Sequence, residues 1–157
     1  MHSLILLVWF TLCAAQDLRQ REIANSLTLG GSALALFYLL WSGNTWLGAT
    51  AEQGGWAFLL ALLLTLPGYA TARLGAGDVK LLIALALASD SRYLLGTLIG
   101  AGVSSLLWLW LGPRLWSRLG KRRRQLLQHL EPQASEKQPF APFLWIGLLC
   151  TTVSLHS

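Results

Sequence analysis

Asp17 and Asp78 are the acidic residues whose positions in the sequence favour a catalytic role. Asp17 closes the first apolar stretch of the chain and Asp78 opens the fourth, so both mark the edge of a hydrophobic segment. A carboxylate at the edge of hydrocarbon is costly unless it faces a cavity, pairs with another group or takes part in a reaction. Two carboxylates in one partly desolvated site do not both ionise easily, so one keeps a proton while the other takes a proton from water. Such a pair hydrolyses amide bonds, and because it titrates as a unit we assign the base role to neither residue.

The residues before Asp78 favour the close approach of a substrate. Gly75 and Gly77 flank Ala76, and two glycines predict a tight turn that a substrate strand can approach. We expect Asp78 at a helix N-terminus, where the helix dipole favours an anion. The alternative is that both aspartates are structural, with Asp17 at the membrane interface and Asp78 as an N-cap. The other five acidic residues need no catalytic explanation: Glu22, Glu52, Asp90, Glu131 and Glu136.

The elements that carry these residues are expected to be membrane helices. Of the 157 residues, 54% are hydrophobic and only 12% are charged, and the mean hydropathy is +0.52. Soluble domains have about 25% charged residues, so the composition excludes a disordered chain, a collagen-like chain and almost any soluble enzyme. Cys13 and Cys150 cannot form a four-ligand zinc site and the three His are scattered, so we predict no metal site. We expect an all-α integral membrane protein.

Six apolar stretches predict six transmembrane helices in one membrane domain that covers residues 1–157. A helix needs about 20 residues to cross the hydrocarbon core unaided, so the first, fourth and sixth stretches are short. No Lys or Arg precedes the first stretch, which favours a retained span over a secretory signal. The stretches lie at about 1–16, 26–41, 54–72, 77–89, 93–112 and 141–155, with a basic cytoplasmic loop at 113–138.

Charge predicts how the chain is threaded. With six crossings, eleven of the twelve Lys and Arg residues fall on one side of the membrane and only Arg92 falls on the other. The positive-inside rule puts the eleven in the cytoplasm, and both termini then lie on the non-cytoplasmic side. Glu52 and Asp90 also lie on that outer side, where Trp41, Trp46 and Trp56 are expected to form an aromatic belt. The eleven are Arg19, Arg21, Arg73, Lys80, Arg114, Arg118, Lys121, Arg122, Arg123, Arg124 and Lys137.

The basic run at 121–124 is a topology signal that also contacts anionic lipid, so we expect no nucleic-acid partner. Four leucines around this run share one helical face, which predicts a helix lying on the membrane surface. They are Leu115, Leu119, Leu126 and Leu130.

Three segments resemble those of the type IV prepilin peptidases. The segment Asp17–Leu29 (DLRQREIANSLTL) resembles the first-aspartate segment of that family. Gly75–Leu82 (GAGDVKLL) is similar to its second, Gly-x-Gly-Asp segment, including the Lys two places after the aspartate. Pro139–Phe143 (PFAPF) resembles the start of the family's last helix, and we expect its two prolines to begin that helix. Order, spacing and expected topology agree over nearly the whole chain.

The resemblance implies a membrane aspartic endopeptidase of the bacterial inner membrane. Such enzymes cut the short basic leader from type IV or Flp-type prepilins at the cytoplasmic face, and Asp17 and Asp78 match their two catalytic aspartates. The expected partners are prepilin or pilin-like substrates and the lipid bilayer, and no metal, nucleotide or other cofactor is implied. The surrounding motif residues are Gly75, Gly77, Lys80 and Asn25.

The chain departs from the family pattern in two ways. Ala24 stands where the family commonly has Pro, directly before Asn25. Larger members carry a further cytoplasmic domain with paired Cys-x-x-Cys motifs and methylate the new N-terminus. Because this sequence has no such motif, it resembles the short, peptidase-only branch, and we expect no N-methyltransferase activity.

The roles of two motif residues stay open. Lys80 either holds the Asp78 carboxylate or extends to the membrane interface. Asn25 either fixes the loop after Asp17 or caps the second span, and we favour the cap.

Other classes of protein also stay open. In a non-catalytic membrane scaffold of pilus or secretion assembly, both aspartates would be interfacial or capping residues, and replacing them by Asn would spare function. A small transporter is less favoured, because no charged residue falls at mid-span. Presenilin-like and signal-peptide-peptidase-like proteases also use Gly-x-Gly-Asp, but their first aspartate usually follows Tyr, whereas Gln16 precedes Asp17.

Overall fold

The computed structural model of the chain describes residues 2–20, 23–71, 74–118, 120–126 and 140–156. These residues form seven helices, and the β-structure among them is one isolated bridge between Asn44 and Thr50. The predicted all-helical fold is therefore confirmed for this part of the chain. The helices are α1 (His2–Gln20), α2 (Asn25–Ser42), α3 (Ala51–Ala70), α4 (Ala76–Ala88), α5 (Ser91–Arg118), α6 (Lys121–Leu126) and α7 (Ala141–His156).

Each of the six predicted apolar stretches lies mostly within one helix, in α1 to α5 and in α7. Two segments are long and apolar enough to cross a membrane on their own, Ala51–Ala70 and Ser91–Leu115. The apolar segment of α7, Ala141–Leu155, is shorter. These helices support membrane association, whereas the number of crossings and the side on which the termini lie stay predictions.

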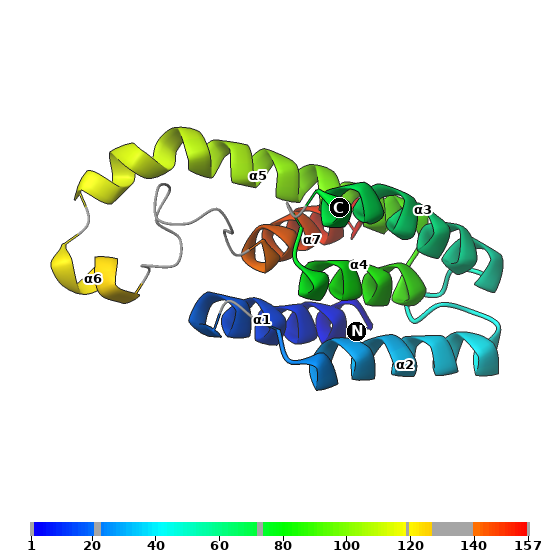
Figure 1. The fold of residues 1–157 in the computed structure, drawn as a ribbon. Helices are drawn as coiled ribbons and strands as arrows, with labels where there is room; N and C mark the ends of the chain where they lie inside the picture. The colour runs from blue at the N-terminus through cyan, green and yellow to red at the C-terminus, as the bar shows by residue number, and fades with distance from the viewer. Residues whose placement is uncertain (1, 21–22, 72–73, 119, 127–139, 157) are drawn as a thin grey trace.

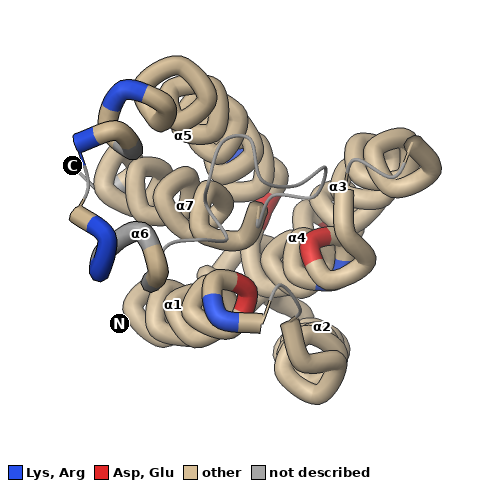
Figure 2. The backbone as a smooth tube through the Cα atoms, turned by 60° about the vertical axis from the view of Figure 1, so that its left-hand side comes forward, with Lys and Arg blue, Asp and Glu red and all other residues tan. Residues whose placement is uncertain are grey.

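Helices that follow one another in the bundle run in opposite directions, so the bundle has two distinct ends (Figure 1). One end holds the last residues of α1, α3 and α5 and the first residues of α2, α4 and α7. We call it the basic end, because described Lys and Arg residues gather there (Figure 2): Arg19, Lys80, Arg114, Arg118, Lys121 and Arg122. The opposite end holds the start of α1, the end of α7, and the α2–α3 and α4–α5 connections.

The central helix of the bundle is α4. All of its residues from Leu81 to Ala88 are buried apart from Ile83, as expected for a helix that is apolar on every side. It packs mainly against α2 and α3, whereas α7 packs against α5 and α1. Small residues allow the close contact of α5 and α7, since a Cβ atom added to Gly100 would lie 2.6 Å from the Cα atom of Gly147.

The opposite end is held by an aromatic cluster. Trp46, in the α2–α3 connection, packs on the rings of His2 and Tyr38 at centroid distances of 5.2 and 4.9 Å. Its indole N–H also donates to the His2 carbonyl at 3.2 Å. Trp41 and Trp56 are 81% and 61% exposed, as expected for interfacial residues. Trp46 therefore has a packing role that the predicted belt of three exposed tryptophans does not include.

The region after the fifth apolar stretch differs from the expectation. Helix α5 continues through Pro113 to Arg118 rather than ending near 112. A single surface helix through 115–130 is wrong, because Gly120 separates α5 from α6 and glycine is a poor residue inside a helix. Leu119, Leu130, Pro139 and the predicted loop after 126 lie outside the described residues.

Candidate active site

Asp17 lies on the buried face of α1. It follows Leu6, Phe10 and Cys13 at spacings of three or four residues, so these side chains share one side of the helix, and all four are buried. Asp17 is 6% exposed, and its Oδ2 accepts a hydrogen bond of 3.1 Å from the backbone N–H of Ala141 in α7. The carboxylate is therefore enclosed by the bundle rather than placed on its surface.

Asp78 is the third residue of α4 and is also buried, with 8% of its surface exposed. Its N–H donates to the carbonyl of Gly75 at 3.1 Å. Gly75 occupies the N-cap position of α4, so the interpretation of Asp78 as the N-cap residue is wrong. The Asp78 carboxyl group instead accepts a hydrogen bond from the backbone of Gly75. Its predicted place in the first turn, where the dipole favours an anion, is confirmed.

The fold brings these two carboxylates together. Asp17 and Asp78 interact electrostatically, although 61 positions separate them in the sequence. Figure 2 shows the acidic positions of α1 and α4 near the same end of the bundle. Two buried carboxylates that interact electrostatically do not both ionise easily, which is the electrostatic condition for two-aspartate hydrolysis.

Where a glycine is needed in the second segment, the reason is the room that a side chain would take up, and not an unusual backbone conformation. Gly75 has a φ of −73°, which any residue adopts, so the predicted need for a glycine turn is wrong. A Cβ atom at Gly75 would lie 3.3 Å from Oδ2 of Asp78, which is tighter than most real contacts. At Gly77 the same atom would meet Ile23 at an ordinary 3.6 Å. Gly75 therefore keeps the space beside Asp78 open, and nothing in the structure requires a glycine at 77.

Lys80 and Asn25 contact each other instead of the groups predicted for them. The Lys80 ammonium donates to Oδ1 of Asn25 at 2.8 Å, which joins the first turns of α4 and α2. Lys80 does not hold the Asp78 carboxylate, to which it makes no ion pair within the described residues. Asn25 is the first residue of α2 rather than its cap, because the N-cap position belongs to Ala24.

Two contacts near Asp17 were not predicted from the sequence, one made by its neighbour Gln16 and one by Ala141. Gln16 precedes Asp17, and its Oε1 accepts a hydrogen bond of 3.1 Å from the N–H of Ala24 at the start of α2. Ala141 contributes only its backbone N–H to Asp17. Neither contact has a signal in the sequence, because an amide side chain beside a span and an apolar residue at a helix start are both common.

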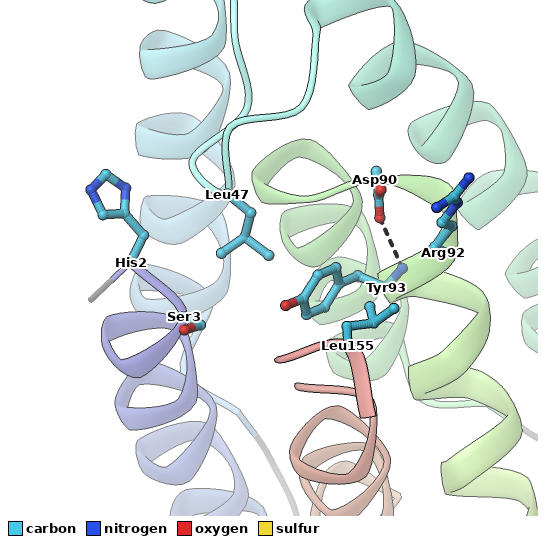
Figure 3. Close-up of a pocket in the computed structure, with 7 residues that line it drawn as sticks. All are labelled: His2, Ser3, Leu47, Asp90, Arg92, Tyr93 and Leu155. Atoms are coloured by element: carbon cyan, nitrogen blue, oxygen red, sulfur yellow. Dashed lines mark hydrogen bonds between the residues drawn. The ribbon is translucent and has the colours of Figure 1, made fainter. Parts of the chain in front are cut away.

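The acidic residues of the opposite end have a structural explanation or are distant from the site. Asp90 accepts a hydrogen bond of 2.9 Å from the N–H of Tyr93 and thereby caps the start of α5 (Figure 3). It lines a cavity of about 340 Å³ together with His2, Tyr93 and Leu155. Glu52 lies in the first turn of α3. Glu22, Glu131 and Glu136 lie outside the described residues.

The described part of the chain contains no group of three His, Cys, Asp or Glu side chains that could hold a metal ion. The two buried carboxylates can supply an acid and a base to an amide bond. A model of the type IV leader peptidase family matches residues 4–110, which is more than half of the chain and includes both aspartates. No curated protein and no solved structure matches the chain. The chain therefore belongs to the type IV leader peptidase family.

Proposed function

We propose that this chain is an aspartic endopeptidase that cuts the basic leader from type IV or Flp-type prepilins, with Asp17 and Asp78 as its catalytic residues. The observation that carries the proposal is the burial of two electrostatically interacting carboxyl groups, from separate helices, at one end of the bundle. Burial of two interacting carboxyl groups is costly unless they take part in a reaction or pair with another group. Membership of the leader peptidase family supports cleavage of a leader peptide as the reaction that these groups catalyse.

The proposed reaction moves protons between the two carboxyl groups, a water molecule and the scissile amide. The ionised carboxylate takes a proton from water, whose oxygen attacks the carbonyl carbon, while the protonated carboxyl donates its proton to the carbonyl oxygen. The tetrahedral intermediate then collapses: the C–N bond breaks as the carboxyl group that took a proton from water gives it to the leaving nitrogen. The other carboxylate takes a proton back from one of the two hydroxyl groups on the carbon, so the new carboxylic acid forms and both aspartates return to their starting states. Oδ2 of Asp17 is bonded to Ala141, so Oδ1 is the oxygen that we assign to proton transfer.

We propose six membrane crossings, with the site at the cytoplasmic face of the inner membrane. The described cations support this threading, because six of them gather at the basic end whereas Arg92 starts α5 at the opposite end. The site lies at the basic end, so a basic leader would stay in the cytoplasm while the apolar helix of the substrate remained in the bilayer. The single membrane domain over 1–157 belongs to the same proposal.

A non-catalytic scaffold is the second candidate, and one observation favours it. The hydrogen bond from Ala141 gives Asp17 a structural role at the start of α7. Asp78 has a comparable contact, because its carboxyl group accepts a hydrogen bond from the backbone of Gly75 at the N-cap position of α4. The two candidates differ in their response to Asn, which can keep the bond to Ala141 but cannot exchange protons as a carboxyl group does.

Co-expression of the chain with a prepilin from the same genome tests the proposed function. Wild type, Asp78→Asn and Asp90→Asn are compared for membrane accumulation and for the mobility shift of the cleaved pilin. We expect wild type and Asp90→Asn to cleave, because Asn also caps helices well and Asp90 lies far from the site. Asp78→Asn should accumulate without cleaving. Cleavage by Asp78→Asn at the wild-type rate would favour the scaffold.

The mass of the mature pilin tests a further part of the proposal. We propose that the chain does not methylate the new N-terminus, because its two cysteines, Cys13 and Cys150, lie in α1 and α7 and form no Cys-x-x-Cys motif. The product made by the purified chain in the presence of a methyl donor should have the mass of a free amine. A product heavier by one methyl group would contradict this.

A further inference from the structure

The first turn of α7 contacts the candidate active site from outside the residues that the family model matches. The family model matches residues 4–110, whereas α7 starts at Ala141. Ala141 is fully buried, and its N–H donates to Asp17 across 124 positions of sequence. A segment beyond the family match therefore touches one of the two proposed catalytic carboxylates.

The backbone N–H of Ala141, in the first turn of α7, has no hydrogen-bond acceptor within the helix itself. The Phe140 carbonyl accepts hydrogen bonds from Phe143 and Leu144, at 3.0 and 3.1 Å, so Phe140 occupies the N-cap position. Pro142 has no N–H. The donor of Ala141 has no partner within α7 because it belongs to the first turn, and a buried donor without a partner is costly. The Asp17 carboxylate is the partner that the fold supplies.

Two further contacts fix α7 in place beside α1. The indole N–H of Trp145 donates to Oγ1 of Thr11 at 2.8 Å, which joins the two helices four residues after Ala141 and six residues before Asp17. On its other side, Gly147 lies directly against the backbone of Thr97 and Ala101 in α5. The start of α7 is thus held by packing on both sides, so it can serve as a rigid support for a carboxylate.

We infer that the N-terminus of α7 is a positioning element of the active site, in which the Ala141 N–H orients the Asp17 carboxylate and leaves Oδ1 for proton transfer. The inference rests on the proposed function, because it gives Asp17 a reaction to be positioned for. Ala141 is a positioning residue rather than a catalytic one, since it acts through Asp17. A misplacement of a catalytic group by about 1 Å costs about 100-fold in rate, so the loss of this support should be visible in kcat.

The test compares Ala141→Pro with Ala141→Val in the purified full-length protein in lipid vesicles, with a purified prepilin as substrate. Proline removes the N–H, and it is well tolerated at the first position of a helix. Valine adds a similar volume but keeps the donor, so it reports the effect of volume alone. We expect kcat of the proline variant to be about 10–100-fold below that of the valine variant, with KM changed by less than about threefold.

Several results would overturn the inference. Equal kcat values for the two variants would mean that the N–H does not position Asp17, and a loss confined to KM would assign α7 to substrate binding instead. If the proline variant fails to accumulate, amide hydrogen–deuterium exchange of two Asp17 variants tests the contact between Asp17 and α7 instead. The amides at 140–144 should exchange faster in Asp17→Ala than in Asp17→Asn, and equal exchange would refute the contact. Exchange needs no cleavage, so an inactive wild type would refute the proposed function without affecting this second measurement.

Discussion

Replacing Asp17 by Asn and by Ala separates the chemical role of this residue from its structural role. Both substitutions remove the ionisable carboxyl group of residue 17, so the difference between the two variants isolates the hydrogen bond to α7. Asn keeps an oxygen that can accept the Ala141 N–H, whereas Ala leaves that donor buried without a partner. A buried donor that loses its partner costs about 1–3 kcal/mol.

We therefore expect Asp17→Ala to be less stable than Asp17→Asn by about 1–3 kcal/mol of unfolding free energy, and we expect neither variant to cleave. The loss of an acid–base group lowers cleavage by about 10²–10⁴-fold in each case. Denaturant titration of the purified variants in mixed micelles, followed by helix content, measures the stability difference. Cleavage of a purified prepilin by the same preparations measures the chemical effect.

The two measurements can fail separately. Equal stability of Asp17→Ala and Asp17→Asn would refute the assignment of Asp17 as the partner of α7. Cleavage by Asp17→Asn at the wild-type rate would refute its catalytic role while leaving its structural role intact. A stability difference together with the loss of cleavage in both variants is the result that assigns both roles to one carboxylate.

Two other contacts lead to predictions. Lys80→Met keeps the apolar stem of the side chain but loses the hydrogen bond to Asn25, so the rate of cleavage should fall by about 2–10-fold. Asn25→Ala should cause the same loss, and the double variant should lose no more than either single variant. Additive losses would refute a shared role of the two residues. Gly147→Ala would place a Cβ atom 2.7 Å from the backbone N of Ala101, so it should lower the unfolding free energy by about 1–3 kcal/mol. Gly102→Ala in α5, where nothing lies within 4 Å, is its control in the same denaturant titration and should not destabilise.

Hydropathy and charge were sufficient to predict the helices and the pair of aspartates. Each apolar stretch lies mostly within a helix, as expected for segments that would have to satisfy their backbone groups internally in hydrocarbon. Asp17 and Asp78 could be placed at one end because the alternating helix directions put the last residues of α1 and the first residues of α4 at the same end of the bundle. These inferences depend on local composition and on the number of apolar stretches between two residues, which predicts the end of the bundle at which each residue lies. The sequence contains both.

The partners of individual side chains were not predictable in the same way. The bond between Asp17 and Ala141 depends on how α1 and α7 pack, and no local pattern reports a contact across 124 positions. From neighbours in sequence, a cap is favoured for Asn25, and Lys80 stays open between the Asp78 carboxylate and the membrane interface, whereas the packing of α2 on α4 pairs the two residues with each other. The break at Gly120 did have a signal, but the repeated leucines outweighed a single glycine in the helical pattern.

The central claim is that Asp17 and Asp78 act as one catalytic unit. It is tested most directly by the cleavage rates of the purified wild type, Asp17→Asn, Asp78→Asn and the double variant, reconstituted in lipid vesicles with a purified prepilin. Residues that act as a unit are not additive, so each single variant should be as inactive as the double variant. A single variant that cleaves at the wild-type rate, or a double variant whose loss is the product of two partial losses, would contradict the claim.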